Sequence, residues 1–175
     1  APADNFEASE VIKQAVSYNQ PLYIRYGKKP MMDIHPPGTK FKIGKSILVK
    51  KGEDLTIIAT GETLQRAYLA YEILKENNIH CSIISMHTIK PFDKETFLEF
   101  SKNSKAILTI EEHSMFGGLG ECCANLIAQN NIDTKLKILG IPDEYMINGS
   151  QSDVLDYYNM SPERIVEISK DLLNK

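Results

Sequence analysis

The sequence predicts an α/β protein, folded as a three-layer α/β/α sandwich with about five mostly parallel strands. From about residue 45 onward, short β-type runs alternate with segments of helical periodicity, as in βαβ units. The runs TIIAT (56–60) and AILTI (106–110) are apolar without alternation, as expected for strands that helices cover on both faces. With 175 residues and 42% hydrophobic content, the chain can bury one good core.

The first quarter of the chain follows a different pattern. Apolar residues at helical spacing predict a helix over residues 4–17, which Asp4 could cap with Glu7 three positions on. PLYIRY (21–26) is typical of a short strand. The next stretch, GKKPMMDIHPPGTKF, has three prolines, two glycines and no periodicity, and is predicted to be a linker. The quarter therefore resembles a helix and a strand of another sheet, tied to the main body by an irregular segment.

The elements of the main body follow in order along the chain. Two β runs flank a turn at 51–54; then come a helix over 62–78, a strand over 80–89, a helix over 93–104, a strand over 106–113, a helix over 120–131 and a strand over 135–141. Two short helices close the chain, the second capped by Ser161 with Pro162 at its first position.

Composition restricts the possible partners. The net charge of −3 and the dispersed Lys and Arg residues offer no basic stripe, so nucleic acid is not expected to bind. No run approaches the roughly 18 apolar residues of a membrane helix, and no signal peptide pattern is present, which favours a cytoplasmic location without a membrane partner. Cys81, Cys122 and Cys123 have neither disulfide nor metal spacing. The start without Met suggests a processed product or an internal piece of a longer chain.

The stretch EEHSMFGGLGE (111–121) allows two interpretations. Backbone N–H groups of residues 117–120 at a helix N-terminus could hold an anion. The spacing is neither the dinucleotide fingerprint nor a P-loop, so a tight strand-to-helix turn is the preferred interpretation. Glu111 and Glu112 are neighbours on a strand end and point to opposite faces, so they cannot form one acid/base pair. His113 is expected to be a structural or interface residue.

Two further groups of polar residues could carry a function. In HTIKPFD (87–93), Asp93 is expected to cap a helix rather than to join a catalytic set. In YIRYGKK, the residues Arg25, Tyr26, Lys28 and Lys29 could bind a phosphate, because the Arg fork and Lys point charges suit that group. The alternative is a solvated charge cluster at a domain edge. His35 and His80 have no metal-ligand spacing, and no metal site is expected.

Taken together, these segments resemble the C-terminal portion of the transketolase family. The resemblance is carried, in order, by Pro2-Ala3-Asp4 with Glu7, PLYIRYGK, TIIATG, MHTIKPFD, TIEEHSMFGGLGE, LGIPDEYMINGS and SDVLDYYNMSPERIV. It covers essentially the whole chain, and the tail is most similar to the C-terminal subunit of split, two-chain transketolases.

The resemblance implies a domain organisation. Residues 1–28 would be the end of the pyrimidine-binding domain, 29–41 a linker and 42–175 the transketolase C-terminal domain. In the family, thiamine diphosphate and Mg²⁺ sit between two upstream domains at a dimer interface. The resemblance therefore implies no catalytic, cofactor-binding or metal-binding residue in this chain, and it makes EEHSMFGGLGE a structural signature.

One functional role is carried over by the resemblance. Family members place an arginine shortly after the strand at PLYIRY, where it binds the substrate's sugar phosphate. Lys28 occupies that position here, and Arg25 matches an arginine of several branches. Lysine keeps the charge but loses the bidentate fork. Lys28 and Arg25 are the expected substrate phosphate contacts.

The expected function is the C-terminal part of a thiamine diphosphate-dependent transketolase, inert alone, which moves a two-carbon ketol group between sugar phosphates. Its expected partners are the rest of the polypeptide or an N-terminal subunit, within a homo-oligomer. The enzymatic alternatives are 1-deoxyxylulose-5-phosphate synthase and a 2-oxo acid dehydrogenase beta subunit. A partner-docking module is the alternative of another class, if Met31, Met32, Met115 and Phe116 form one patch. A free-standing nucleotide-binding domain is the weakest, because the glycine spacing is wrong.

Overall fold

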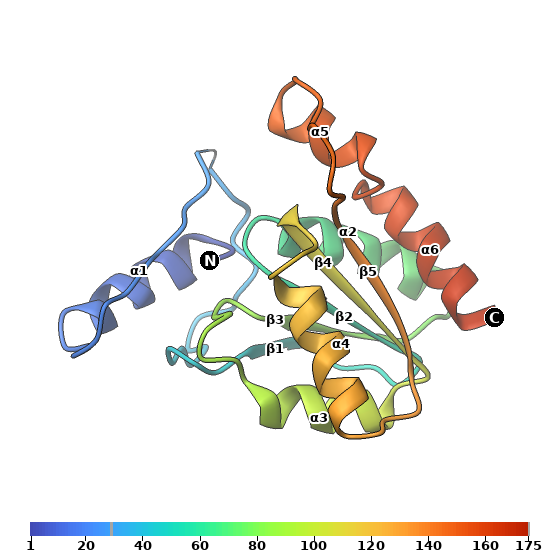
Figure 1. The fold of residues 1–175 in the computed structure, drawn as a ribbon, viewed down its shortest axis with the longest axis horizontal. Coiled ribbons are helices and arrows are strands. Elements are labelled where there is room, and N and C mark those ends of the chain that lie inside the picture. Colours follow the sequence, from blue (N-terminus) through green and yellow to red (C-terminus); the bar gives the residue numbers. More distant parts are fainter. Residues whose placement is uncertain (29, 175) are drawn as a thin grey trace.

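A mixed sheet forms the centre of the protein (Figure 1). The computed structural model describes residues 1–28 and 30–174. Its five strands lie in the order β1-β3-β2-β4-β5, with β1 antiparallel to β3 and the other pairs parallel. Their bounds are β1 Ile47–Lys50, β2 Leu55–Ala59, β3 Cys81–Ser85, β4 Ala106–Ser114 and β5 Lys135–Ile141. This confirms the predicted class, although β3 ends four residues earlier than the sequence pattern indicated.

Helices cover both faces of the sheet, which completes the three layers (Figure 1). Helices α2 (Thr63–Glu76), α5 (Gln151–Tyr157) and α6 (Pro162–Asn174) pack on one face. Helices α3 (Lys94–Asn103) and α4 (Leu119–Gln129) pack on the other.

Successive strand residues alternate between the two cores. The first core takes Ile57, Ile83 and Leu108, and the second takes Ile58, Ile84 and Ile107. All six side chains are fully buried, so the strands are apolar on both faces, as the sequence pattern predicted.

The first quarter of the chain lies beside the sandwich (Figure 1). Helix α1 (Asn5–Ala15) forms as predicted, and the Asp4 carboxylate caps it by accepting the Glu7 N–H at 2.9 Å. The strand predicted at 21–26 is absent, and that prediction is wrong. A strand requires hydrogen bonds from a neighbouring strand. Among the described residues, none pairs with this segment, which stays extended without a ladder.

A buried polar cluster joins this quarter to the sheet. The Asp4 carboxylate accepts the Ile34 N–H at 3.0 Å and lies 2.7 Å from His35 Nδ1. The fully buried Glu7 carboxylate accepts hydrogen bonds from the Ser85 hydroxyl at 2.6 Å and the Ala3 N–H at 2.7 Å. His35 Nε2 lies 3.3 Å from Glu7 Oε1. The cluster thus connects α1, the segment at 34–35 and β3.

Burial and hydrogen bonding act in opposition on the ionisable groups of this cluster. Burial alone would raise the pKa of Asp4, but hydrogen bonds from His35, Glu7 and Ile34 outweigh it and lower that pKa to about 2. Burial raises the pKa of Glu7 despite the Ser85 hydrogen bond. Burial would lower the pKa of His35, but the hydrogen bond to Asp4 and the charge of Glu7 raise it. The Asp4 charge is therefore stabilised by the fold.

We predict that Asp4→Asn lowers the free energy of unfolding by about 2–3 kcal/mol at neutral pH. Asparagine is as good an N-cap, so the loss reports the second carboxylate oxygen, which accepts the Ile34 N–H and contacts buried His35, rather than the helix cap. Because the folded pKa of Asp4 is depressed, its stabilisation is present above the ordinary pKa of 3.8 and is lost as the pH falls toward 2. Urea unfolding between pH 2 and pH 7 measures both effects.

The control for this variant is Glu10→Gln, because Glu10 pairs with Lys13 on the outer side of the same helix. We expect it to change stability by no more than about 0.5 kcal/mol. A difference between wild type and Asp4→Asn that stayed constant down to pH 2 would contradict the assigned role of the Asp4 charge.

Candidate functional site

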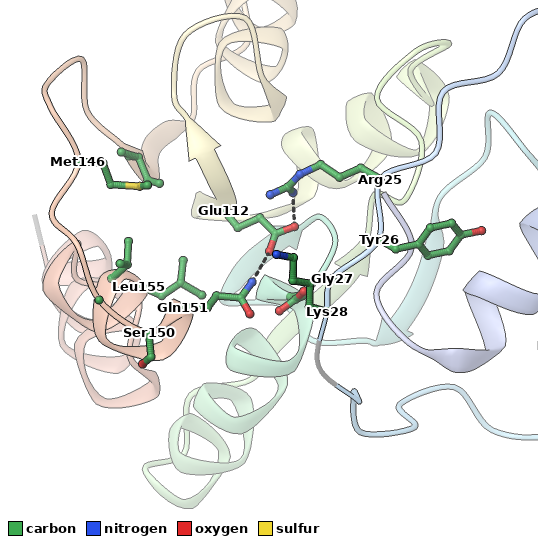
Figure 2. Close-up of a pocket in the computed structure, with 13 residues that line it drawn as sticks. Arg25, Tyr26, Gly27, Lys28, Glu112, Met146, Ser150, Gln151 and Leu155 are labelled. Atoms are coloured by element: carbon green, nitrogen blue, oxygen red, sulfur yellow. Dashed lines mark hydrogen bonds and ion pairs between the residues drawn. The ribbon is translucent and has the colours of Figure 1, made fainter.

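The carboxyl ends of β4 and β5 open into a cavity of about 520 Å³ (Figure 2). This is the edge where parallel α/β sheets gather ligands, and the volume suits a small molecule. One wall is the segment 25–28, which lies outside the sandwich in sequence. Opposite it lie the end of β5, the loop at 146–150 and the start of α5. The cavity is thus built from both parts of the chain.

The structure brings the two predicted phosphate contacts, Arg25 and Lys28, into this cavity. Tyr26 also lines it, but Figure 2 shows its ring turned away from the side chain of Glu112. Lys29, the fourth residue of the predicted cluster, lies outside the described residues. Two cationic side chains spaced three positions apart therefore line one cavity.

An ion pair crosses the cavity (Figure 2). The Arg25 guanidinium donates to the carboxylate of Glu112, at the end of β4. The Arg25 side chain is 40% exposed, whereas that of Glu112 is 5% exposed. The side-chain amide of Gln151, at the start of α5, donates to the same carboxylate at 3.5 Å. Glu112 thus connects the N-terminal segment with the sheet and α5.

Glycines make room for the two carboxylates in the cavity. Gly61, at φ +58°, lies where a Cβ atom would come within 2.7 Å of Glu112 Oε1. A Cβ atom on Gly27 would collide with the carboxylate of Glu62, the buried residue before α2. Sequence reasoning missed Glu62 and Gln151 as parts of the site. The available signal was the position of Glu62 three residues after the end of β2.

Four charged side chains of the described chain line the cavity. Arg25 and Lys28 carry two positive charges, and Glu62 and Glu112 carry two negative charges. A mixed lining of this kind can hold a phosphate through its cations and hydroxyl groups through its carboxylates. A ligand that carries both a charged group and an apolar part would match the cavity, because apolar side chains line it as well. These are Ile141, Met146, Val154 and Leu155.

The turn EEHSMFGGLGE holds an anion, but that anion is internal. The buried carboxylate of Glu111 accepts the N–H groups of Leu119 at 2.7 Å and Gly120 at 2.8 Å, at the start of α4. A side chain on Gly118 would collide with this carboxylate. Helix N-termini favour negative charge, and here the chain supplies it. The preferred interpretation, a tight structural turn, agrees with this geometry.

The adjacent glutamates serve different faces, as the strand geometry predicted. Glu111 points to α4, and Glu112 points to Arg25 and Gln151. Burial raises the pKa of Glu111, although the N–H groups of Gly120 and Leu119 act against that rise. His113 lies 3.4 Å from Glu111, with Nδ1 3.0 Å from the Ser114 carbonyl oxygen.

The residues of HTIKPFD are structural. Asp93 caps α3 by accepting the Thr96 N–H at 3.5 Å, and it also accepts the Thr96 hydroxyl at 2.8 Å and the Ser46 N–H at 2.9 Å. The ring of His87 stacks on Phe41 at 4.2 Å, and burial lowers the pKa of His87 to about 3. A neutral, stacked histidine has a packing role, which agrees with the structural interpretation of this motif.

The described residues contain no group of three or more His, Cys, Asp or Glu side chains that could hold a metal ion. None of the helices described is both long and apolar enough to cross a membrane.

We predict that Glu111→Gln lowers the free energy of unfolding by about 1–3 kcal/mol. The amide can accept at one oxygen only, and its NH₂ group would face a buried backbone N–H that it cannot satisfy. Thermal or urea unfolding measures the change. The control is Glu121→Gln, which alters an exposed carboxylate bonded to the Gly117 N–H at the same turn. Equal effects of the two variants would contradict the role given to Glu111.

Comparison with known proteins agrees with the resemblance seen in the sequence. The sequence model of the transketolase C-terminal domain matches residues 44–165. A protein of Methanocaldococcus jannaschii, named provisionally as a transketolase C-terminal section, is 39% identical over 95% of this chain and 52% of its own length. One of the subunits of the apulose-4-phosphate transketolase of Phocaeicola vulgatus is 33% identical over 99% of this chain and 55% of its own length.

A solved structure extends the similarity to the whole fold. A split gene transketolase, described as an inactive beta4 tetramer, superposes with a TM-score of 0.91 at 27% identity. The match covers 99% of this chain and 56% of that protein. The chain thus spans about half the length of the relatives it matches first. From the domain match, the relatives and the shared fold, this chain belongs to the transketolase C-terminal domain family.

Proposed function

We propose that this chain is the C-terminal part of a thiamine diphosphate-dependent transketolase that transfers a two-carbon ketol group between sugar phosphates. One observation carries the proposal: two relatives that align with at least 95% of the chain, residues before the matched domain included, are named as transketolase sections or subunits. We place the enzyme in the cytoplasm and its reaction in pentose phosphate metabolism.

The proposal assigns some domains of the enzyme to this chain and the cofactor-binding domains to an upstream section. Residues 1–28 would complete the pyrimidine-binding domain, 29–41 would link the parts, and 42–175 would form the third domain. The position of α1 and its neighbours beside the sandwich supports this division (Figure 1). Thiamine diphosphate with Mg²⁺, when bound upstream, supplies the electron sink that two-carbon transfer needs. This chain alone would be inert.

The cavity would give this chain its part in substrate binding. Lys28 and Arg25 are positioned to hold the phosphate of a sugar phosphate, and the carboxylates beside them can accept hydrogen bonds from hydroxyl groups. Their proposed role is to orient the substrate rather than to move a proton. An N-terminal section of the same enzyme and a further copy of the assembly are the proposed partners.

The principal alternative is 1-deoxyxylulose-5-phosphate synthase. The enzyme of that name from Heliobacterium modesticaldum is 28% identical over 98% of this chain, but the match covers only 27% of its length. The two relatives with the higher identities, of which this chain covers about half, favour a two-part transketolase. A dehydrogenase beta subunit and a docking module are supported by no comparable observation.

The first test is reconstitution of the enzyme with its upstream section, thiamine diphosphate and Mg²⁺. We expect xylulose 5-phosphate and ribose 5-phosphate to yield sedoheptulose 7-phosphate, followed by chromatography or a coupled assay. Neither section alone should give product. Decarboxylation of pyruvate with both sugars inert would instead assign the chain to one of the alternative enzymes.

We predict that Lys28→Ala in the reconstituted enzyme raises KM for the phosphorylated substrate about tenfold, with a small effect on kcat. A non-phosphorylated ketose should be used equally well by both forms, because it lacks the group that Lys28 would bind. The matched control is Lys51→Ala, which removes an exposed lysine from the turn between β1 and β2. An equal loss with the non-phosphorylated substrate would contradict phosphate binding by Lys28.

A further inference from the structure

The Arg25–Glu112 ion pair occupies the place where the proposed phosphate would bind. Arg25 is a proposed phosphate contact, yet its guanidinium already donates to a carboxylate. That carboxylate is almost fully buried and lies against Gly61, so the surrounding residues hold it in one place in the cavity. The contact is therefore a feature of the site and not a surface pair of little consequence.

The Glu112 carboxylate contacts Arg25 through Nη1 alone. A phosphate that approached this edge of the guanidinium would compete with the carboxylate for that nitrogen. A second anion close to Glu112 would also be repelled by it, because charges interact strongly where little water screens them. A bare phosphate ion therefore binds Arg25 only against the repulsion of the Glu112 carboxylate.

A sugar phosphate differs from a bare phosphate in having hydroxyl groups. If its phosphate takes Arg25, the Glu112 carboxylate needs new donors, because a buried charge without hydrogen bonds is costly. Gln151 already donates to it, and sugar hydroxyls can supply further donors. The cavity of about 520 Å³ has room for both ends of such a molecule.

We propose that Glu112 is a specificity-determining residue: it is an internal counter-ion of Arg25 that competes with the phosphate of a ligand, and it accepts hydroxyl groups of that ligand. The proposal rests on the phosphate role proposed for Arg25 and Lys28. Glu112 lowers the affinity of the cavity for simple anions and gives the advantage to polyhydroxylated phosphates. The alternative is a positioning role, in which Glu112 orients Arg25 for phosphate and increases the affinity for every anion.

The test is a titration of the full chain with inorganic phosphate and, separately, with ribose 5-phosphate, at constant ionic strength. Calorimetry gives the Kd, and the Nε–H signal of Arg25 in NMR spectra locates the binding. We expect Glu112→Gln to bind inorganic phosphate about tenfold more tightly than wild type. The gain for ribose 5-phosphate should be clearly smaller, because the amide is a poorer acceptor for hydroxyl groups. Arg25→Gln should remove the gain.

The control variant is Glu167→Gln. Glu167 is also the partner of an arginine, Arg164, but this pair lies exposed on α6 outside the cavity lining. It changes the net charge equally and should leave phosphate binding unchanged. Glu112→Asp keeps the charge but withdraws the carboxylate from Arg25, and is expected to fall between wild type and Glu112→Gln. If Glu112→Gln does not fold, Glu112→Asp serves as the test variant.

Unchanged or weaker phosphate binding by Glu112→Gln would overturn the proposal, and so would an equal gain for both ligands. The absence of phosphate binding in every variant would overturn it as well. The outcome is separable from the proposed function, since two-carbon transfer by the reconstituted enzyme is measured independently. Transfer without the expected affinity changes would reject the role of Glu112 alone, and the reverse result would reject transketolase activity alone.

Discussion

The site depends on a buried carboxylate cluster that lies some distance from it. Segment 21–26 has no strand partner among the described residues, so a backbone ladder does not hold it in place. The segment follows α1, and α1 is fixed to the sheet by the buried contacts of Asp4 and Glu7 with His35 and Ser85. Gln14 adds hydrogen bonds to the linker, at Phe41 and Ile43. The buried contacts around the start of α1 therefore fix the element from which the segment with Arg25 extends, and Glu112 holds Arg25 itself.

Those parts of the fold that depend on local patterns could be predicted from sequence. The caps at Asp4, Asp93 and Ser161 were foreseen because capping involves residues only three positions apart. The buried parallel strands were foreseen because unbroken apolar runs need cover on both faces. The strand predicted at 21–26 was wrong because its residues suit a strand, but a local pattern cannot show whether another strand lies beside it.

The candidate site was predictable only in part. Arg25 and Lys28 could be proposed because they lie in one short segment with the right chemistry for phosphate and match positions of the family that the sequence resembles. The contact of Arg25 with Glu112 joins residues 87 positions apart, and no spacing rule reaches that far. Strand geometry predicted that Glu111 and Glu112 point in opposite directions. It could not predict which of them faces a helix and which faces a cavity. That choice depends on the order of strands in the sheet.

The division of the cavity between two parts of the chain has an evolutionary consequence. The residues that would recognise a substrate's phosphate and hydroxyl groups lie here, whereas the cofactor chemistry is assigned to the other section. A change of substrate can then arise by substitutions around Glu112 and Gln151 without disturbing the reactive centre. Separate genes for the two sections would let one catalytic half be combined with recognition halves of different selectivity.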